Sequence, residues 1–295
     1  MINSALARSI RGSLLVASLI ATRALGAQGL SYDMLTTGTG PDRTGAMTTR
    51  NFMSAHGQFA GGNSRLDITE SMASGGMMGM GTYTITSGSK GTVTSVDPAK
   101  HQYTVIDIAE MGKAANDAQA ALGGIAKMEF TDIKVDLQDL GAGEPIDGYA
   151  TYKYRLTQAF TMKMTMMGHS INSPSSSSTE IWIAPQLDGL MDPSARPMVA
   201  TPSGPMGELM RQMTAQYGKM KKGLPLKRIT TSVSGDGARQ RTTTMTSTIT
   251  NVKKSAINPS VFEVPASYTK VDFAGMLGAS AAEAQAKAKA QHGKP

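Results

Sequence analysis

The fold is decided by residues 223–272, whose sequence is GLPLKRITTSVSGDGARQRTTTMTSTITNVKKSAINPSVFEVPASYTKVD. Between Thr242 and Ile249, threonine occupies every even position, and the odd positions include Met245. A period of two is typical of a strand with one covered face and one solvated face. An Asp-Gly pair in the middle supplies the positive φ that a tight hairpin turn needs. The segment therefore predicts two long antiparallel strands, a charged turn and a short closing strand that ends in FEVPASY.

Shorter segments of the same kind precede this hairpin. In residues 65–70, Leu66 and Ile68 alternate with polar side chains, and turn residues at 88–91 separate two further alternating runs. The other strand candidates are 32–37, 46–55, 57–59, 83–87, 92–96, 102–106, 130–137, 148–160, 161–167 and 180–184, with a serine-rich loop at 172–178. Their close spacing predicts an antiparallel meander in a mainly β (α+β) domain that spans residues 28–272.

Two segments have helical periodicity. Residues 108–121 are rich in alanine, and a Gly-Gly pair follows them as an end signal. In residues 205–221, apolar side chains recur at spacings of three and four, which builds one continuous stripe along a helix. The stripe consists of Met206, Leu209, Met210, Met213, Tyr217 and Met220. We therefore expect two helices packed against the sheet.

The N-terminus has the pattern of a secretory signal peptide. Arg8 and Arg11 precede the apolar run 14–21, which is too short to span a bilayer, and small residues follow it. The alternative is a buried N-terminal helix, but no acidic residue occurs before Asp33. We therefore expect residues 1–27 to be a signal peptide, cleaved after Gly26 or Ala27. The chain would then be exported, periplasmic or secreted, and soluble after cleavage.

Composition excludes several function classes. The absence of cysteine rules out disulfides, a thiolate metal site, a cysteine nucleophile and a lipid-modified N-terminal cysteine. The net charge of +7 is thinly spread and aromatic residues make up 5% of the chain, which argues against nucleic-acid binding. No run after the signal is apolar enough to span a membrane. Residues 273–295 are rich in alanine and lysine and are expected to form a frayed helix or a disordered tail.

Five motifs occur in an order that resembles a known family. They are RLDI, GTVTSVDPAKHQYTVID, GYATYKYRL, EIWIAP and the C-terminal PLK with V-K-K-x-x-I-x-P-x-x-F-E-V-P-x-x-Y. Together they are similar to an exported bacterial family of unknown function that looks related to the periplasmic lipoprotein carriers (LolA/LolB-like). The resemblance implies a single curved antiparallel sheet, a half-barrel, with helices over its concave face. In the carriers that concavity holds acyl chains.

No combination of residues predicts a reaction. None of the four histidines has a further His, Asp or Glu at metal-ligand spacing. The segment around Ser170 only partly matches the nucleophile elbow of a hydrolase. The glycine-rich stretch 38–45 lacks the Lys-Ser/Thr ending of a phosphate loop. We therefore expect a non-enzymatic protein with no cofactor and no resident metal.

The methionines and tyrosines predict an apolar ligand surface. Methionine is unbranched and polarizable, so it suits a surface that adapts to varied apolar partners such as a lipid, an acyl chain or an apolar segment of an envelope protein. The expected lining is Tyr152, Tyr154, Leu156, Met162, Met164 and Met166 on strands, with Met206, Met210, Met213 and Tyr217 on the helix. Two alternatives stay open. Met162, Met164, Met166 and His169 could bind Cu(I), or the helix could close a dry core in a structural envelope protein that has no ligand.

Overall fold

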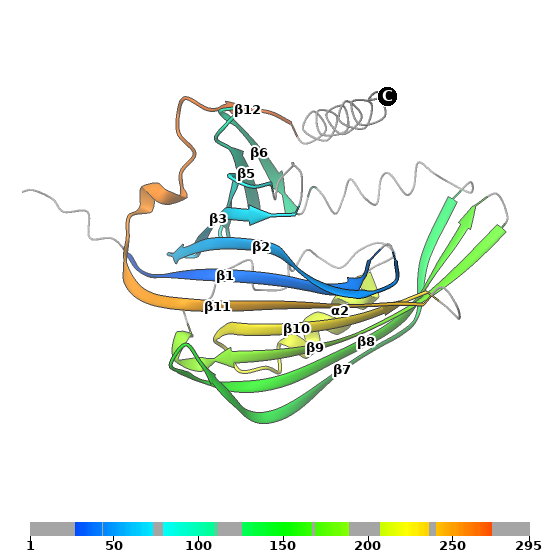
Figure 1. Ribbon diagram of the computed structural model, residues 1–295. Coiled ribbons are helices and arrows are strands. Elements are labelled where there is room, and N and C mark those ends of the chain that lie inside the picture. Colours follow the sequence, from blue (N-terminus) through cyan, green and yellow to red (C-terminus); the bar gives the residue numbers. More distant parts are fainter. Residues whose placement is uncertain are drawn as a thin grey trace, which may run out of the picture.

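The protein is mainly β and forms one open sheet of twelve strands (Figure 1). The computed structural model describes residues 27–42, 44–72, 79–108, 110, 126–166, 169–188, 207–235 and 240–272. The expected signal peptide up to residue 26, most of the helix at 108–121, Met206 and the tail at 273–295 lie outside these residues.

The sheet has the strand order β12-β6-β5-β4-β3-β2-β1-β11-β10-β9-β8-β7. The strands are β1 (Ala27–Pro41), β2 (Met47–Ala60), β3 (Asn63–Ser71), β4 (Tyr83–Ser87), β5 (Thr92–Asp97), β6 (Gln102–Asp107), β7 (Ala126–Ile146), β8 (Tyr149–Met166), β9 (His169–Ala184), β10 (Leu224–Ser234), β11 (Arg241–Ile257) and β12 (Thr269–Lys270). The described helical elements are the 3₁₀ turns η2 (Pro185–Leu187) and η5 (Pro259–Phe262), and the helix α2 (Gly207–Tyr217). The pairs are antiparallel apart from β12 with β6. This confirms the predicted antiparallel, mainly β class.

The decisive segment forms the hairpin β10–β11 that its alternation predicts. Lys227 pairs with Thr248 and Ser234 with Arg241, and Gly235 has a φ of +86°, as the turn requires. The prediction of a closing strand through FEVPASY is wrong. The chain turns instead at η5, where the Asn258 side chain accepts a hydrogen bond from the Ser260 N–H at 3.1 Å. The cause is the lack of N–H groups at the prolines of this segment, which removes ladder donors.

The prediction of a serine-rich loop at 172–178 is also wrong. These residues lie inside β9, which pairs without interruption with β8 from Tyr152↔Ile183 to Met166↔His169. On its other side, β9 pairs with β10 from Leu224↔Ala184 to Ser234↔Ser175. Serine has a low preference for strands, but pairing on both sides overrides a weak local preference.

One edge of the sheet is the long strand β7, and it carries several features that oppose further strand pairing. Its register with β8 shifts at three places, and Asp132 adopts a φ of +55° at the first of them. The helix α2 lies against β7, and the Gln216 side chain donates a hydrogen bond to the Val135 carbonyl at 3.2 Å. Bulges, charges and a covering helix are the usual protection of an edge strand. Helix α2 confirms, over residues 207–217, the helix predicted at 205–221, whereas its place over a concave face stays a prediction.

The buried residues form three clusters along the sheet. The first joins the middle strands and η2, the second holds η5 against β4 and β5, and the third lies on β8 and β9 next to α2. Their fully or nearly fully buried members are Leu30, Ala184, Leu187, Leu224 and Leu226; Tyr83, Ile85 and Val96; and Tyr154, Ile181 and Ile183. The third cluster occupies one of the two faces on which the candidate site residues lie.

Candidate apolar binding surface

The side chains of β8 divide the sheet into two surfaces. Because its pairing with β9 has no bulge, side chains alternate strictly from Tyr152 to Thr165. We call the surface that contains Tyr154 the Tyr154 face, and the opposite surface, which contains Thr157, the Thr157 face. Residues directly opposite on neighbouring strands point to the same side. The register therefore assigns the residues of β7, β9 and β10 to one face or the other.

Three of the predicted lining residues belong to the packed core on the Tyr154 face. Tyr154 and Leu156 are 2% and 3% exposed, and Tyr152 packs beside them. Tyr217 of α2 and Met220 contact the same cluster, and the Tyr154 hydroxyl accepts a hydrogen bond from the Lys221 N–H at 3.2 Å. Tyr217 and Met220 thus pack directly against the cluster that contains Tyr154, and these side chains fill the space between β8 and α2.

The predicted methionines lie farther along β8, on the same face. Met164 pairs with Met128 of β7 and with Ile171 of β9, and Met162 pairs with Phe130. We call the group Met128, Phe130, Phe160, Met162, Met164 and Ile171 the methionine platform. Met128 is 37% exposed and Ile171 is 66% exposed, while the other members are half-buried. The platform is therefore an apolar surface that is partly open to solvent.

The platform is held together by cross-strand packing at the far ends of β7, β8 and β9, which bend away from the other strands (Figure 1). The rings of Phe130 and Phe160 meet edge to face with their centroids 5.4 Å apart. Met128, Phe130 and Ile171 were missed by sequence reasoning, because only the register of three strands brings them beside Met162 and Met164. The alternation of Met128 and Phe130 before the bulge was the available signal.

The remaining predicted residues are placed as follows. Met210 and Met213 are half-buried on α2, and Met206 lies outside the described residues. Met166 pairs with His169, whose side chain is exposed. Ten residues separate Tyr154 from Met164, about 33 Å along an extended strand. The predicted lining thus consists of a packed region next to α2 and an open region at the methionine platform.

Between the two regions, Gln158 contributes a polar group to the same face. Its side-chain oxygen is buried and accepts no hydrogen bond within the described part of the chain. A buried acceptor without a donor costs about 1–3 kcal/mol. A group that donates a hydrogen bond at this point would therefore be stabilised.

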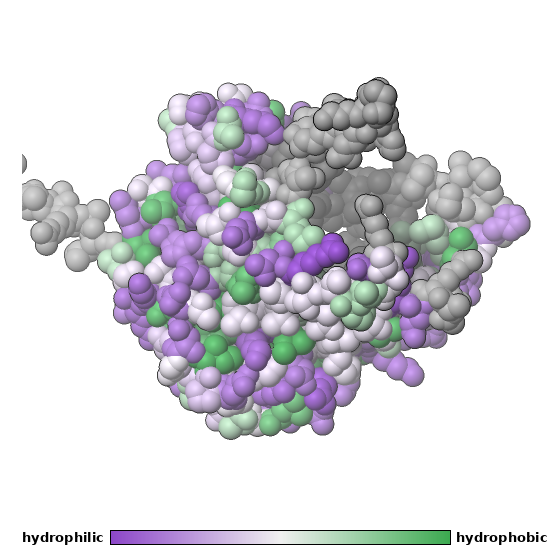
Figure 2. Space-filling view, in the orientation of Figure 1, coloured by the Kyte–Doolittle hydropathy of each residue, from purple (hydrophilic) through white to green (hydrophobic). Residues whose placement is uncertain are grey.

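Hydrophobic residues elsewhere do not mark a single site. Figure 2 shows them as small, separate patches among polar residues on the side in view. Such scattering is ordinary for a protein surface. The methionine platform is defined by strand register and burial, and not by a large apolar patch.

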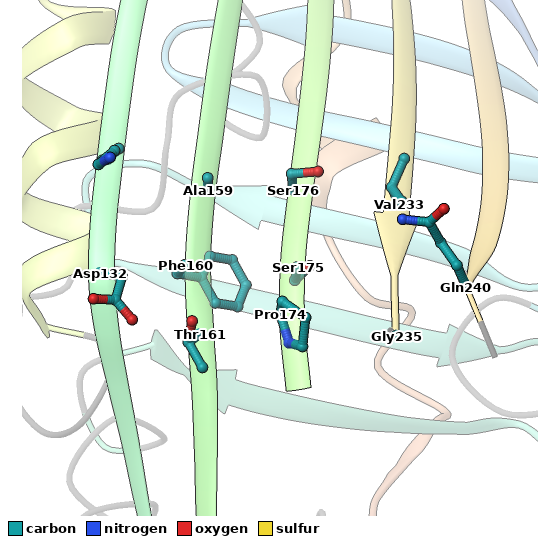
Figure 3. A pocket seen from close by; sticks show the side chains of 11 residues that line it. Asp132, Ala159, Phe160, Thr161, Pro174, Ser175, Ser176, Val233, Gly235 and Gln240 are labelled. Atoms are coloured by element: carbon teal, nitrogen blue, oxygen red, sulfur yellow. The ribbon is translucent and has the colours of Figure 1, made fainter. Parts of the chain in front are cut away.

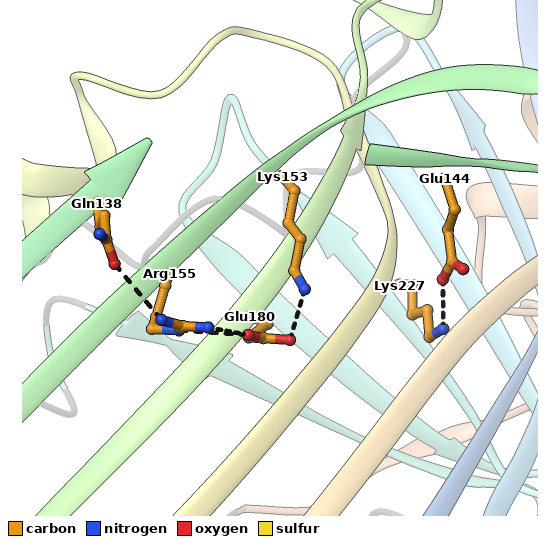
Figure 4. Close-up of polar contacts among 6 residues, drawn as sticks. All are labelled: Gln138, Glu144, Lys153, Arg155, Glu180 and Lys227. Carbon is orange, nitrogen blue, oxygen red and sulfur yellow. Dashed lines mark hydrogen bonds and ion pairs between the residues drawn. The ribbon is translucent and has the colours of Figure 1, made fainter. Parts of the chain in front are cut away.

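The Thr157 face carries a network of charged side chains (Figure 4). It lies beside Trp182, the only tryptophan of the sequence. Glu180 accepts hydrogen bonds from Lys153 at 2.9 Å and from Arg155 at 2.7 Å. Trp182 is flanked by the ammonium groups of Lys153 and Lys227, 4.4 and 4.9 Å from the indole centroid. The register explains this, since Trp182 lies opposite both lysines. The hydrogen bonds from Lys153 and Arg155 lower the pKa of Glu180 below its ordinary value.

We expect Glu180→Gln to destabilise the protein by about 1 kcal/mol at neutral pH, a value discounted for the partial exposure of Arg155. A lowered folded-state pKa contributes stability above the unfolded-state pKa and loses it as the pH falls through the folded-state value. The difference from wild type should therefore shrink below about pH 4. Urea unfolding at several pH values measures this. Glu144→Gln is the control. Glu144 forms an ion pair with Lys227 and is more exposed than Glu180, so its replacement should lower the stability less. A difference that stays constant down to acid pH would contradict the assignment.

The structure also brings together a histidine and an aspartate that sequence spacing did not reveal. His56 of β2 lies 2.9 Å from Asp33 of β1, and Asn251 donates to the other oxygen of Asp33 at 2.8 Å. The hydrogen bonds from His56 and Asn251 lower the pKa of Asp33. Both members of the pair are about half exposed, so they lack the buried setting of a catalytic dyad. Ser170, whose surrounding segment partly matches a nucleophile elbow, forms a hydrogen bond of 2.9 Å with the Thr165 hydroxyl.

The described part of the chain was compared with two simple signatures, a cluster of metal ligands and a membrane-spanning helix. No three His, Asp or Glu side chains there lie close enough to hold a metal ion. None of the helices among these residues has the length and hydrophobicity needed to cross a bilayer.

Comparison with protein-family models finds no match, and no curated protein sequence matches the chain.

Proposed function

We propose that the protein is an exported, non-enzymatic binding protein that holds an acyl chain or another apolar segment on its Tyr154 face. The observation that carries this proposal is the methionine platform, where thioether, aromatic and aliphatic side chains from three strands meet and remain partly exposed. Flexible thioethers adapt to chains of different shape. Each buried methylene of a ligand contributes about 0.8 kcal/mol before ordering costs.

The resemblance to the lipoprotein carriers supports the same function. In this proposal the open sheet curves into a half-barrel, its concave side is the Tyr154 face, and helices close over part of it. Tyr217 of α2 already contacts the third cluster on that face. The chain therefore has both a packed region that anchors a helix and an apolar surface beyond it.

Gln158 adds a polar element to this site. Its unpartnered oxygen lies between the core region and the platform. A ligand with an apolar chain and a hydroxyl or amide N–H near its head would satisfy that acceptor while its chain covers the platform. This favours an amphipathic lipid over a plain hydrocarbon.

The test is uptake of a fluorescent fatty acid by wild type and by Met164→Asp. We expect the aspartate to weaken binding at least about tenfold, since a carboxylate buried against an acyl chain costs more than 1.4 kcal/mol. Thr165→Asp is the matched control, because Thr165 is the next residue of β8 and points to the opposite face. Equal affinity for Met164→Asp and Thr165→Asp would refute a site on the platform.

Met164→Leu separates this function from copper binding. Leucine keeps the volume and removes the sulfur, so acyl uptake should persist. Loss of tight Cu(I) binding in this variant, together with no lipid uptake by wild type, would favour the copper alternative. Native mass spectrometry of protein from its own envelope reads out both the bound molecule and the mature N-terminus. A chain that still carries residues 1–26 would contradict export by a cleaved signal peptide.

A further inference from the structure

A shallow groove crosses the Thr157 face, on the side of the sheet opposite the methionine platform (Figure 3). It consists of two adjoining hollows of about 310 and 520 Å³ that share Lys134, Ala159, Ser176 and Val233. The groove runs across β7, β8, β9 and β10. Its floor is low because Ala159, Ser176 and Val233, which lie opposite one another in register, are small. The groove is open along its length, so it suits part of a long chain.

Beside this floor runs a continuous row of hydroxyl side chains. Six residues on six neighbouring strands lie directly opposite one another: Thr157, Ser178, Thr231, Thr244, Thr39 and Thr49. Thr231 and Thr244 are 3.2 Å apart, and Thr39 and Thr49 are 2.7 Å apart, oxygen to oxygen. The row repeats at the strand spacing of about 4.8 Å. A regular array of groups that both donate and accept hydrogen bonds matches a ligand that itself repeats.

The charge of the groove also restricts its ligand. The charged lining residues Asp132, Lys134 and Asp136 all belong to β7, at one end. Everything that β8, β9 and β10 contribute is uncharged. Nucleic acid or another polyanion would need several cations along its path. The lining therefore complements a neutral polar chain.

We propose that this groove binds a segment of a neutral polysaccharide. The hydroxyl groups of Thr157, Ser178 and Thr231 would bond the sugar hydroxyls along one side of the chain. The methyl groups of Ala159 and Val233 would contact the apolar C–H faces of the sugar rings. Carbohydrate binding at this face is independent of the acyl site, because the two lie on opposite faces of the sheet.

The experiment is titration calorimetry of the mature protein with cellohexaose, maltohexaose and a hexamer of N-acetylglucosamine. We expect one of these neutral oligosaccharides to bind. In the double variant Thr157→Val/Thr231→Val its affinity should fall about tenfold or more, because valine keeps the shape of threonine and removes the hydroxyl. Thr250→Val, an exposed position of β11 outside the groove, is the matched control and should bind as wild type does. Valine favours strands, so these variants should fold.

A second variant tests the groove by shape. Ser176→Tyr fills the floor and should abolish binding, whereas Ser255→Tyr at an exposed position of β11 should not. Met164→Asp should leave sugar binding unchanged even if it abolishes acyl uptake. The proposal is overturned if none of the three sugars binds, if the groove variants bind like wild type, or if heparin binds while the neutral sugars do not.

Discussion

Replacing Leu226 by alanine should lower the free energy of unfolding by about 3 kcal/mol. The Leu226 side chain is fully buried in the first cluster, together with Leu30 and Leu224. Leucine-to-alanine changes in packed cores cost about 2–5 kcal/mol, because apolar contact is lost and a cavity remains. Urea unfolding followed by the fluorescence of Trp182 measures the loss.

Leu35→Ala is the matched control for this prediction. Leu35 lies on β1 near the same centre of the sheet but is 43% exposed. Its truncation should therefore change stability by much less. Similar losses for Leu226→Ala and Leu35→Ala would show that the first cluster does not carry the stability of the sheet.

Gly57→Ala is expected to cost about 1–3 kcal/mol, the usual range for forcing extra volume into a packed site. Gly57 of β2 lies under the ring of Tyr32 on β1, and a methyl group at Gly57 would overlap that ring. Tyr32 is 3% exposed, so its ring has little room to move aside. The hydroxyl-bearing ring would have to leave its position, or the two strands would have to separate.

The control for Gly57 is Gly38→Ala on the neighbouring strand. A methyl group at Gly38 meets no atom within 4 Å, and the backbone there needs no positive φ. Alanine at this position should be neutral or slightly stabilising, because it restricts the unfolded chain. Thermal unfolding of both variants measures the difference in stability. A stable Gly57→Ala protein would mean that Tyr32 can leave its place over Gly57 at low cost.

Short-range pattern predicted most of the strands because it depends on side chains within one segment. The alternation of threonine with Met245 and Ile249 predicted β11, and α2 followed from apolar spacing alone. The loop prediction at 172–178 failed because local preference there opposed long-range pairing. The serines at 172–178 join β9 because β8 and β10 supply hydrogen-bond partners on both sides.

The candidate site was only partly predictable for the same reason. Met162 and Met164 were identified from alternation within β8. Their neighbours Met128 and Ile171 come from other strands, and a register shift of one residue would turn either strand's side chains to the other face. The hydroxyl row on the Thr157 face depends on five successive registers, none of which a single segment specifies.

The amino-acid sequence by itself determined the mainly β class, the hairpin of β10 and β11, the helix α2 and the lack of cysteine chemistry. Each of these follows from residue type or from periodicity over a few residues. Only the tertiary structure decided which side chains meet: Trp182 with Lys153 and Lys227, His56 with Asp33, and Met164 with Met128. The physical reason is that strand order and register are set by the burial of the whole sheet, which sums many weak contacts between distant segments.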